Sequence, residues 1–232
     1  MKTIISAEKE IFYKAALQIR DLLSIKPDAV LALCSGRSVA GLYSLLTEMY
    51  AEGKLSFKNA RVFAVTELLE VPAHMSSQKL VFDDFLSKTD MQRDNFFVPD
   101  FACPEKYDEQ IEKAGGIDFA LLGIGENAHI GYNEPATPFS SLTHVQKLTD
   151  RTKAQLSKQF APVDTVPEKA VTMGIKTITQ ARDIHLIALG EDKAQAVHKM
   201  LYGRNDSAVP AAFLQIPLNV SIYLDEAASS QL

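Results

Sequence analysis

The stretch LLGIGENAHIGYNEP, residues 121–135, carries more information about the fold than any other part of the sequence. It begins with an apolar pair typical of the end of a buried strand, after which Gly123 and Gly125 allow the backbone to turn sharply. His129 and Glu134 follow within the same short loop. Because open α/β sheets bind their ligands where strands end, we expect these two side chains to lie at a ligand site.

The histidine and its neighbours suit acid–base chemistry. Imidazole is the side chain whose unperturbed pKa lies near neutral pH, and a nearby carboxylate fixes its tautomer and raises its basicity. We therefore interpret His129 as an acid–base catalyst with Asn127 and Glu134 beside it. The alternative is a surface loop in which the histidine only caps a helix. Turn chemistry alone, however, does not require a histidine and a glutamate so close together.

The composition is that of an ordinary soluble globular protein. The 232 residues are 47% hydrophobic and 23% charged, and we interpret residues 1–232 as a single domain. The formal net charge of -5 argues against nucleic acid or an anionic membrane surface as the main partner. No apolar run approaches the roughly 18 residues that a membrane-spanning helix needs. Cys34 and Cys103 form neither a metal-ligand spacing nor a redox pair, which favours a reducing, cytoplasmic location.

Short apolar runs alternate with amphipathic segments along the whole chain. The expected helices span residues 7–25, 39–52, 76–88, 105–113, 151–160 and 192–201. The expected strands span residues 29–34, 61–65, 96–98, 117–122, 144–148, 184–189 and 220–224, with a further apolar segment at 170–173 and the last strand closing the sheet. This alternation predicts an α/β fold with a doubly wound, mostly parallel, Rossmann-like sheet and helices on both faces.

A first candidate anion site follows the strand at residues 29–34. Ser35, Gly36, Arg37 and Ser38 lie between this strand and a helix, where backbone N–H groups and the helix dipole favour a phosphate. The sequence has neither the P-loop pattern nor the GxGxxG fingerprint. Ser35 or Ser38 could equally serve only as the N-cap of the helix.

Further candidates come from three charged residues. Lys193 lies in the first turn of a helix after Gly190, where its charge opposes the helix dipole unless it faces an anion; the alternative is a solvated surface lysine. Lys158 could be a second cation for the same anion. Glu67 ends the second strand and is a candidate base, but it could equally pair with Arg37 or cap a helix.

The order of these motifs resembles the glucosamine-6-phosphate deaminase/isomerase family, including its galactosamine-6-phosphate branch, over nearly the whole chain. GIGENAHIGYNEP is similar to the family's signature loop, in which a GHI(A/G)FNEP-type segment supplies the catalytic histidine and glutamate. TMGIKTITQARDIHLIALGEDKAQAV and AVPAAFLQ are similar to later segments of the family. The resemblance implies a phosphorylated amino-sugar substrate. It requires no metal or organic cofactor, since ring opening and enolisation are acid–base steps.

The resemblance also implies a role for each matching residue. His129 would open the pyranose ring by moving a proton between the ring oxygen and O1. Glu134 and Asn127 would orient this histidine and tune its charge. The residues that would bind the phosphate are Ser35, Gly36, Ser38, Lys193 and Lys158, the last of which stands where many members have an arginine.

The sequence departs from the family pattern at the end of the second strand. Members generally contain Leu-Asp-Glu-(Tyr/Trp) there, and the aspartate removes the proton from C2. This chain has VTEL at residues 65–68, so that Thr66 stands at the aspartate position and Glu67 at the neighbouring glutamate. Adjacent side chains of a strand point to opposite faces, so Glu67 would need a bend to reach C2. Loss of a positioned base typically costs ~10²–10⁴-fold in rate.

The sequence is compatible with three functions. The first is conversion of glucosamine 6-phosphate or galactosamine 6-phosphate to a ketohexose 6-phosphate and ammonia. The second is hydrolysis of a sugar-phosphate lactone, as in 6-phosphogluconolactonases, which needs no base at C2 and would tolerate Thr66, although NEP after the histidine argues against it. The third is a non-catalytic sugar-phosphate binder. The sequence leaves the sugar epimer and any homo-oligomer open.

Overall fold

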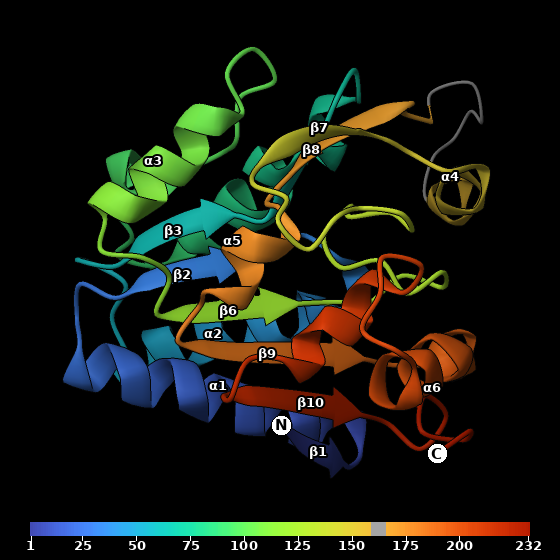
Figure 1. The fold of residues 1–232 in the computed structure, drawn as a ribbon. Helices are drawn as coiled ribbons and strands as arrows, with labels where there is room; N and C mark the ends of the chain where they lie inside the picture. Colours follow the sequence, from blue (N-terminus) through green and yellow to red (C-terminus); the bar gives the residue numbers. More distant parts are fainter. Residues whose placement is uncertain (159–165) are drawn as a thin grey trace.

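The structure, a computed structural model, describes residues 1–158 and 166–232, without the side chain of Arg37. Its centre is a seven-stranded sheet in the order β1-β10-β9-β6-β2-β3-β5, in which all neighbouring strands run parallel (Figure 1). Its strands are β1 (Lys2–Ile5), β2 (Val30–Leu33), β3 (Arg61–Ala64), β5 (Phe96–Phe97), β6 (Phe119–Leu122), β9 (Asp183–Ala188) and β10 (Val220–Leu224). The predicted doubly wound, parallel sheet is confirmed.

Helices cover both faces of this sheet. One face packs on α1 (Glu8–Ile25) and α2 (Ala40–Ala51), and the other on α3 (Glu105–Lys113), α5 (Ile175–Thr179) and α6 (Ala194–Tyr202). Alternate residues of β2 enter the two hydrophobic cores, Leu31 on the α1 side and Ala32 on the other. Burial on both faces explains why the parallel strands are continuously apolar in the sequence.

A second, three-stranded antiparallel sheet lies apart from the first and was not predicted. Its order is β4 (Thr66–Leu68), β8 (Lys169–Thr172) and β7 (His144–Lys147). The strand predicted at residues 144–148 is present as β7, and it belongs to this antiparallel sheet. Positions along β7 alternate between half-buried and exposed, as in a strand with one solvated face, whereas the parallel strands are buried on both.

Three expectations need correction. The strand at residues 220–224 does not close the sheet, because β1 pairs outside it as the edge strand. Residues 76–88 do not form one α-helix. They fold into a π-helical segment, η3 (Gln78–Asp83), and a 3-10 turn, η4 (Leu86–Lys88). The helix expected at residues 192–201 is divided into the 3-10 turn η7 (Glu191–Lys193) and α6.

The helix α4 (Asp150–Ser157) follows β7 and begins at Thr149, whose side-chain oxygen accepts a hydrogen bond from the Thr152 backbone N–H. Beyond Lys158, the end of the helix predicted at 151–160 lies outside the described residues. The remaining short turns are η1 (Arg37–Val39), η2 (Ala73–Met75), η5 (Arg93–Asn95) and η8 (Pro210–Gln215). No helix within the described ranges is long and apolar enough to cross a membrane.

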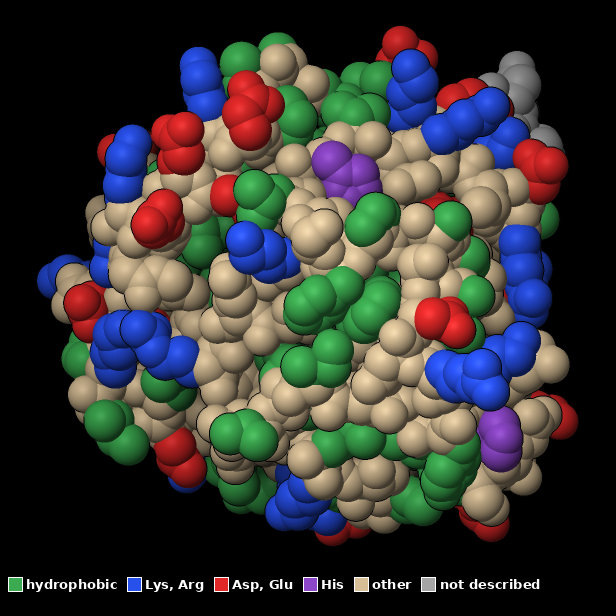
Figure 2. All heavy atoms as spheres, in the orientation of Figure 1, with side chains coloured by type: hydrophobic (Ala, Val, Ile, Leu, Met, Phe, Trp, Pro, Cys, Tyr) green, Lys and Arg blue, Asp and Glu red, His purple; other side chains and the backbone are tan. Residues whose placement is uncertain are grey.

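The sheet topology marks one place for a ligand. β2 and β6 are neighbours, and the chain proceeds outward from them in opposite directions, to β3 and β5 on one side and to β9 and β10 on the other. The carboxyl ends of such a strand pair form a natural crevice. On the surface drawn in Figure 2, acidic and basic side chains are interspersed around the molecule.

Candidate active site

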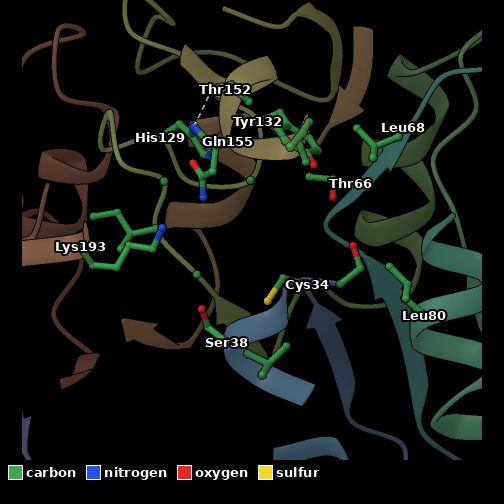
Figure 3. A pocket seen from close by; sticks show the side chains of 18 of the residues that line it. Cys34, Ser38, Thr66, Leu68, Leu80, His129, Tyr132, Thr152, Gln155 and Lys193 are labelled. Atoms are coloured by element: carbon green, nitrogen blue, oxygen red, sulfur yellow. Dashed lines mark hydrogen bonds between the residues drawn. The ribbon is translucent and has the colours of Figure 1, made fainter. Parts of the chain in front are cut away.

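A cavity of about 400 Å³ opens at the carboxyl ends of β2 and β6. Its walls come from the turn after β2, from β4, from the loop after β6, from α4 and from η7 (Figure 3). The lining residues that matter most for its chemistry are Ser35, Gly36, Ser38, Thr66, His129 and Lys193. The histidine and the two candidate anion sites of the sequence therefore meet at one cavity.

His129 lines the middle of this cavity and is 8% exposed. Its Nδ1 is directed at α4, 3.4 Å from the Thr152 hydroxyl oxygen, and lies 3.8 Å from Glu134 Oε2 (Figure 3). Within the described part of the chain, Nε2 has no hydrogen-bond partner, and it is the ring nitrogen left for a ligand. The loop folds tightly enough that a Cβ on Gly125 would lie 2.2 Å from the imidazole Cε1, so only glycine fits there.

Glu134 lies behind the histidine and is 1% exposed. One carboxylate oxygen accepts hydrogen bonds from Asn127 Nδ2 (2.6 Å) and from the Thr149 hydroxyl (3.2 Å), and the other accepts one from the Thr149 N–H (3.2 Å). Asn127 also accepts a hydrogen bond from the His129 N–H through Oδ1 (3.2 Å). The structure thus brings the three predicted residues together, with Asn127 and Glu134 supporting the imidazole from outside the cavity lining.

The surroundings of His129 keep its imidazole neutral. Burial lowers the pKa of His129 below its ordinary value, because the imidazolium form loses solvation. The Glu134 carboxylate opposes this effect, and the Lys193 ammonium adds to it. At neutral pH the side chain is therefore an uncharged base that can accept a proton from a ligand.

The anion-binding end of the cavity is built from two loops. Lys193 is 6% exposed and pairs with Asp192 Oδ2 at 3.0 Å, and both residues line the cavity. Opposite them, Ser35, Gly36 and Ser38 line it from the turn that leads through η1 into α2. The side chain of Arg37, predicted as a fourth member of this loop, lies outside the described atoms.

Two predicted residues do not reach the cavity. The Lys158 side chain is 64% exposed, and its Nζ lies 3.5 Å from Glu126 Oε1. The Glu67 carboxylate accepts hydrogen bonds from the backbone N–H groups of Ser77 (3.0 Å) and Leu68 (2.9 Å). Burial raises its pKa, and these hydrogen bonds oppose the rise. Alternation along β4 places Thr66 in the cavity wall and turns Glu67 away, so this geometry does not support Glu67 as the base that meets the substrate.

Sequence reasoning missed several lining residues. Thr152 is the nearest partner of the His129 ring and follows Thr149 in a capping pattern that the sequence displays. Tyr132 belongs to the signature loop itself, and its ring centroid lies 5.8 Å from that of His129. Leu68 and Leu80 carry no chemical signal, because an apolar side chain that lines a cavity looks like any core residue.

Neither cysteine forms a disulfide. Cys34 lines the cavity, and burial raises the pKa of its thiol to about 11, so the thiol stays protonated at neutral pH. Among the described residues, no cluster of three or more histidine, cysteine, aspartate or glutamate side chains is suited to a metal ion.

Comparison with known proteins places this site in a family. The family model of glucosamine-6-phosphate isomerases/6-phosphogluconolactonase matches residues 6–221. Glucosamine-6-phosphate deaminase of Thermoanaerobacter sp. (strain X514) is 36% identical over 99% of this chain and 94% of its own length. The enzyme of the same name from Bacillus velezensis is 38% identical over 95% of each chain. The chain therefore belongs to the glucosamine-6-phosphate isomerase/6-phosphogluconolactonase family.

Solved structures agree with this placement. A monomeric glucosamine-6-phosphate deaminase superposes with a TM-score of 0.96 at 34% identity, covering 100% of both chains. The 6-phosphogluconolactonase from Trypanosoma cruzi superposes with a TM-score of 0.78 at 20% identity, covering 100% of this chain and 96% of its own. The second similarity is evidence for the fold alone.

Proposed function

We propose that the chain converts a hexosamine 6-phosphate, glucosamine or galactosamine 6-phosphate, to a ketohexose 6-phosphate and ammonia. The observation that carries the proposal is the single cavity shared by His129, Lys193 and the turn at residues 35–38. One small cavity thus holds both an imidazole base and an anion site, and this combination fits a sugar that carries a phosphate group. The names of the relatives that span nearly the whole chain support the same reaction.

The residues divide the work between binding and proton transfer. Lys193 and the backbone of the turn at residues 35–38 hold the phosphate, and this orients the sugar with its ring oxygen and O1 toward His129 Nε2. His129 takes the O1 proton and returns it to the ring oxygen, which opens the ring. Loss of the C2 proton then gives an enolamine, and protonation at C1 gives an iminium at C2. Water hydrolyses this iminium to the ketone and ammonia.

Removal of the C2 proton is the step for which the described residues of the cavity supply no positioned carboxylate base. Thr66 supplies a hydroxyl where a carboxylate is expected. The nearby carboxylates have other partners: Glu134 lies behind the histidine, Glu67 is held by backbone N–H groups, and Asp192 pairs with Lys193. A missing positioned base lowers the rate by ~10²–10⁴-fold. We therefore propose that the protein is a slow deaminase, whose rate is limited by the missing base at C2 and not by sugar binding.

An ammonia-release assay with glucosamine and galactosamine 6-phosphates tests the proposal. We expect turnover of one or both sugars, inhibition by inorganic phosphate, and loss of turnover in His129→Gln. Substitution of His198, which is on α6 with its Nδ1 within 2.8 Å of the Gln231 carbonyl oxygen, is the matched control. A folded protein that binds a hexosamine 6-phosphate and releases no ammonia from either epimer rejects this function.

A lactone hydrolase is the second candidate, because hydrolysis of a lactone needs no base at C2 and Thr66 would then be harmless. Hydrolysis of 6-phosphogluconolactone above the spontaneous rate, without ammonia release from the amino sugars, would select it. Tight calorimetric binding without either reaction would select a sugar-phosphate sensor. We also propose a reducing, cytoplasmic location, which the two free cysteines support. A homo-oligomer stays a prediction, which light scattering of the purified chain decides.

A further inference from the structure

The two ends of the cavity differ in charge. Lys193 and Asp192 occupy one end, and His129 occupies the middle. The far end is formed by Thr66 and Leu68 and carries no charge (Figure 3). Thr66 is 7% exposed, and its hydroxyl has no hydrogen-bond partner within the described part of the chain. A sugar held by its phosphate at Lys193 therefore passes His129 before it meets the neutral end.

The carboxylates near the cavity have partners away from that end. Glu134 accepts three hydrogen bonds behind the imidazole, and Glu67 is held by backbone N–H groups on the opposite side of β4. Asp192, the one carboxylate among the described residues that line the cavity, is paired with Lys193 at the phosphate end. His129 is thus the base that faces the sugar.

The two proton transfers of the proposed reaction make different demands. Ring opening moves one proton from the O1 hydroxyl to the ring oxygen, and a single imidazole can accept it from one and deliver it to the other. Removal of the carbon-bound proton at C2 requires a base placed at a different point of the substrate. For the first transfer, the cavity offers His129 Nε2, which has no hydrogen-bond partner among the described residues. For the second, it offers the Thr66 hydroxyl.

We propose that the protein is an anomerase of aldose 6-phosphates, which opens and recloses the sugar ring many times for each ammonia that it releases. This inference rests on the sugar-phosphate site proposed above. In the forward step the O1–H and C1–O5 bonds break and the C1 carbonyl forms, with the proton passing through His129 to O5. Rotation about the C1–C2 bond turns the other face of the carbonyl to O5. Reclosure by the reverse proton transfer then gives the other anomer.

The substrate class follows from the neutral end of the cavity. Ring opening involves only C1, O1 and O5, so the substituent at C2 takes no part in it. Thr66 and Leu68 offer no countercharge for a C2 ammonium group and can accommodate a C2 hydroxyl equally well. Both 2-amino and 2-hydroxy aldose 6-phosphates, for example glucosamine 6-phosphate and glucose 6-phosphate, are therefore substrates for anomer exchange.

Exchange spectroscopy by NMR measures this activity directly. The rate of interconversion between the α and β anomers of each sugar phosphate is recorded with and without the protein, and ammonia release is followed on the same samples. We expect anomer exchange of both sugars to exceed ammonia release from glucosamine 6-phosphate by ~10²-fold or more. His129→Gln returns exchange to the rate of buffer alone, and His198→Gln does not.

A second variant keeps the proposal testable if His129→Gln does not fold. Thr66→Asp restores a carboxylate at the neutral end, so the ratio of anomer exchange to ammonia release falls at least tenfold. An unchanged ratio overturns the inference.

The outcomes separate the two proposals. Ammonia release as fast as anomer exchange overturns the anomerase and leaves the deaminase standing. Exchange without any ammonia supports the anomerase and rejects the deaminase. Calorimetric binding with neither activity rejects both.

Discussion

At the scale of single residues, two threonine hydroxyls connect the imidazole to its carboxylate. The Nδ1 of His129 is 3.8 Å from Glu134, beyond a good hydrogen bond, but Thr152 Oγ1 lies 3.4 Å from that nitrogen and 3.2 Å from Thr149 Oγ1, which reaches Glu134. A chain of hydroxyls can pass the orienting effect of the carboxylate to the ring. Thr152 is thus a positioning residue that acts through His129.

Removal of the Thr152 hydroxyl should lower activity while leaving the rest of the cavity lining in place. In Thr152→Val we expect kcat/KM for the anomer exchange to fall about tenfold, a loss of about 1.4 kcal/mol, because the ring loses its nearest buried partner. Thr152→Ser should recover most of it. Thr47→Val, which removes a hydroxyl bonded within α2 to the Tyr43 carbonyl oxygen, is the control. Equal losses in the serine and valine variants would contradict a positioning role.

The protonation of His129 predicts the acid limb of the pH profile. Because its pKa in the free protein is lowered by burial, the imidazole stays neutral in solutions where an exposed histidine is already charged. We expect kcat/KM to stay constant as the pH falls through 6.5, the value of a free imidazole, and to decline only in more acidic solution. A half-maximal point at or above pH 6.5 in steady-state rates would show that the site does not depress this pKa.

Lys193 should control affinity rather than proton transfer. Lys193→Met keeps most of the buried apolar stem and removes the charge, so we expect the inhibition constant of inorganic phosphate to rise at least tenfold. Lys199→Met, on the exposed side of α6, provides the matched loss of one positive charge. Phosphate inhibition weakened equally by both variants would point to net charge alone.

At the scale of elements, the loop after β6 is shaped by steric limits. Ala128 has a φ of 65°, and its N–H donates to the Gly125 carbonyl while the Gly125 N–H donates to the His129 carbonyl. These turns force the imidazole against the backbone of Gly125 and expose its other edge to the cavity. Backbone strain of this kind is common where a loop positions a catalytic group.

Gly125→Ala tests this packing. The added methyl would lie 2.2 Å from Cε1 and 2.4 Å from both ring nitrogens, so the imidazole must move. We expect activity to fall by ~10²-fold or more, as a displaced reacting group commonly causes, while inorganic phosphate still binds. Phosphate binding by calorimetry and the melting temperature show whether the fold survives. Activity within twofold of the parent would mean that the loop relaxes around the methyl.

The sequence predicts elements well where local pattern decides them and poorly where long-range pairing does. The apolar runs of β2, β6 and β9 mark strands buried on both faces, and a helix that begins near residue 8 is visible in its amphipathic spacing. β4 is too short to show a period, and β1 is exposed at most positions, so neither has a local signature. Only their pairing with β10 and β8, which are distant in the sequence, makes β1 and β4 strands.

The site was predictable to a similar degree. His129, Glu134 and Asn127 share an unusual local sequence, and Lys193 follows a glycine turn at the start of a helix. The structure brings His129 and Lys193 to one cavity, with Asn127 and Glu134 behind the histidine. Lys158 was predicted to bind the phosphate because it stands where many family members have an arginine. A long side chain at the end of α4 can, however, point away from the cavity. The direction of Glu67 depends on the register of β4 with β8, which no local pattern shows.

At the scale of the whole molecule, an ion cluster stabilises the end of the sheet opposite the cavity. Asp118, 6% exposed, pairs with Lys26 and Arg182 and accepts a hydrogen bond from the Val30 N–H at 2.8 Å. It thus ties the end of α1 to β2, β6 and β9. Burial alone would raise the pKa of Asp118, but the lysine, the N–H and the arginine outweigh this effect and hold the pKa below its ordinary value.

Asp118→Asn should destabilise the fold without affecting the reaction. We expect the free energy of unfolding to fall by about 1–3 kcal/mol at pH 7. A group whose pKa is lowered by folding contributes stability above its unfolded pKa of about 3.9 and loses it as the pH falls further. The difference between parent and variant in urea titrations should therefore shrink below pH 4. Asp21→Asn, which removes an exposed pair with Arg20, should change stability by less than about 1 kcal/mol.

The pairing of the first strand with the last has a consequence for biosynthesis. β1 has β10 as its neighbour in the sheet, so residues 2–5 wait for residues 220–224 to emerge from the ribosome. At ordinary translation speeds that delay is on the order of ten seconds or more. During that interval the nascent β1 lacks its strand partner, and a chaperone that covers it would shorten the exposure of an unpaired strand.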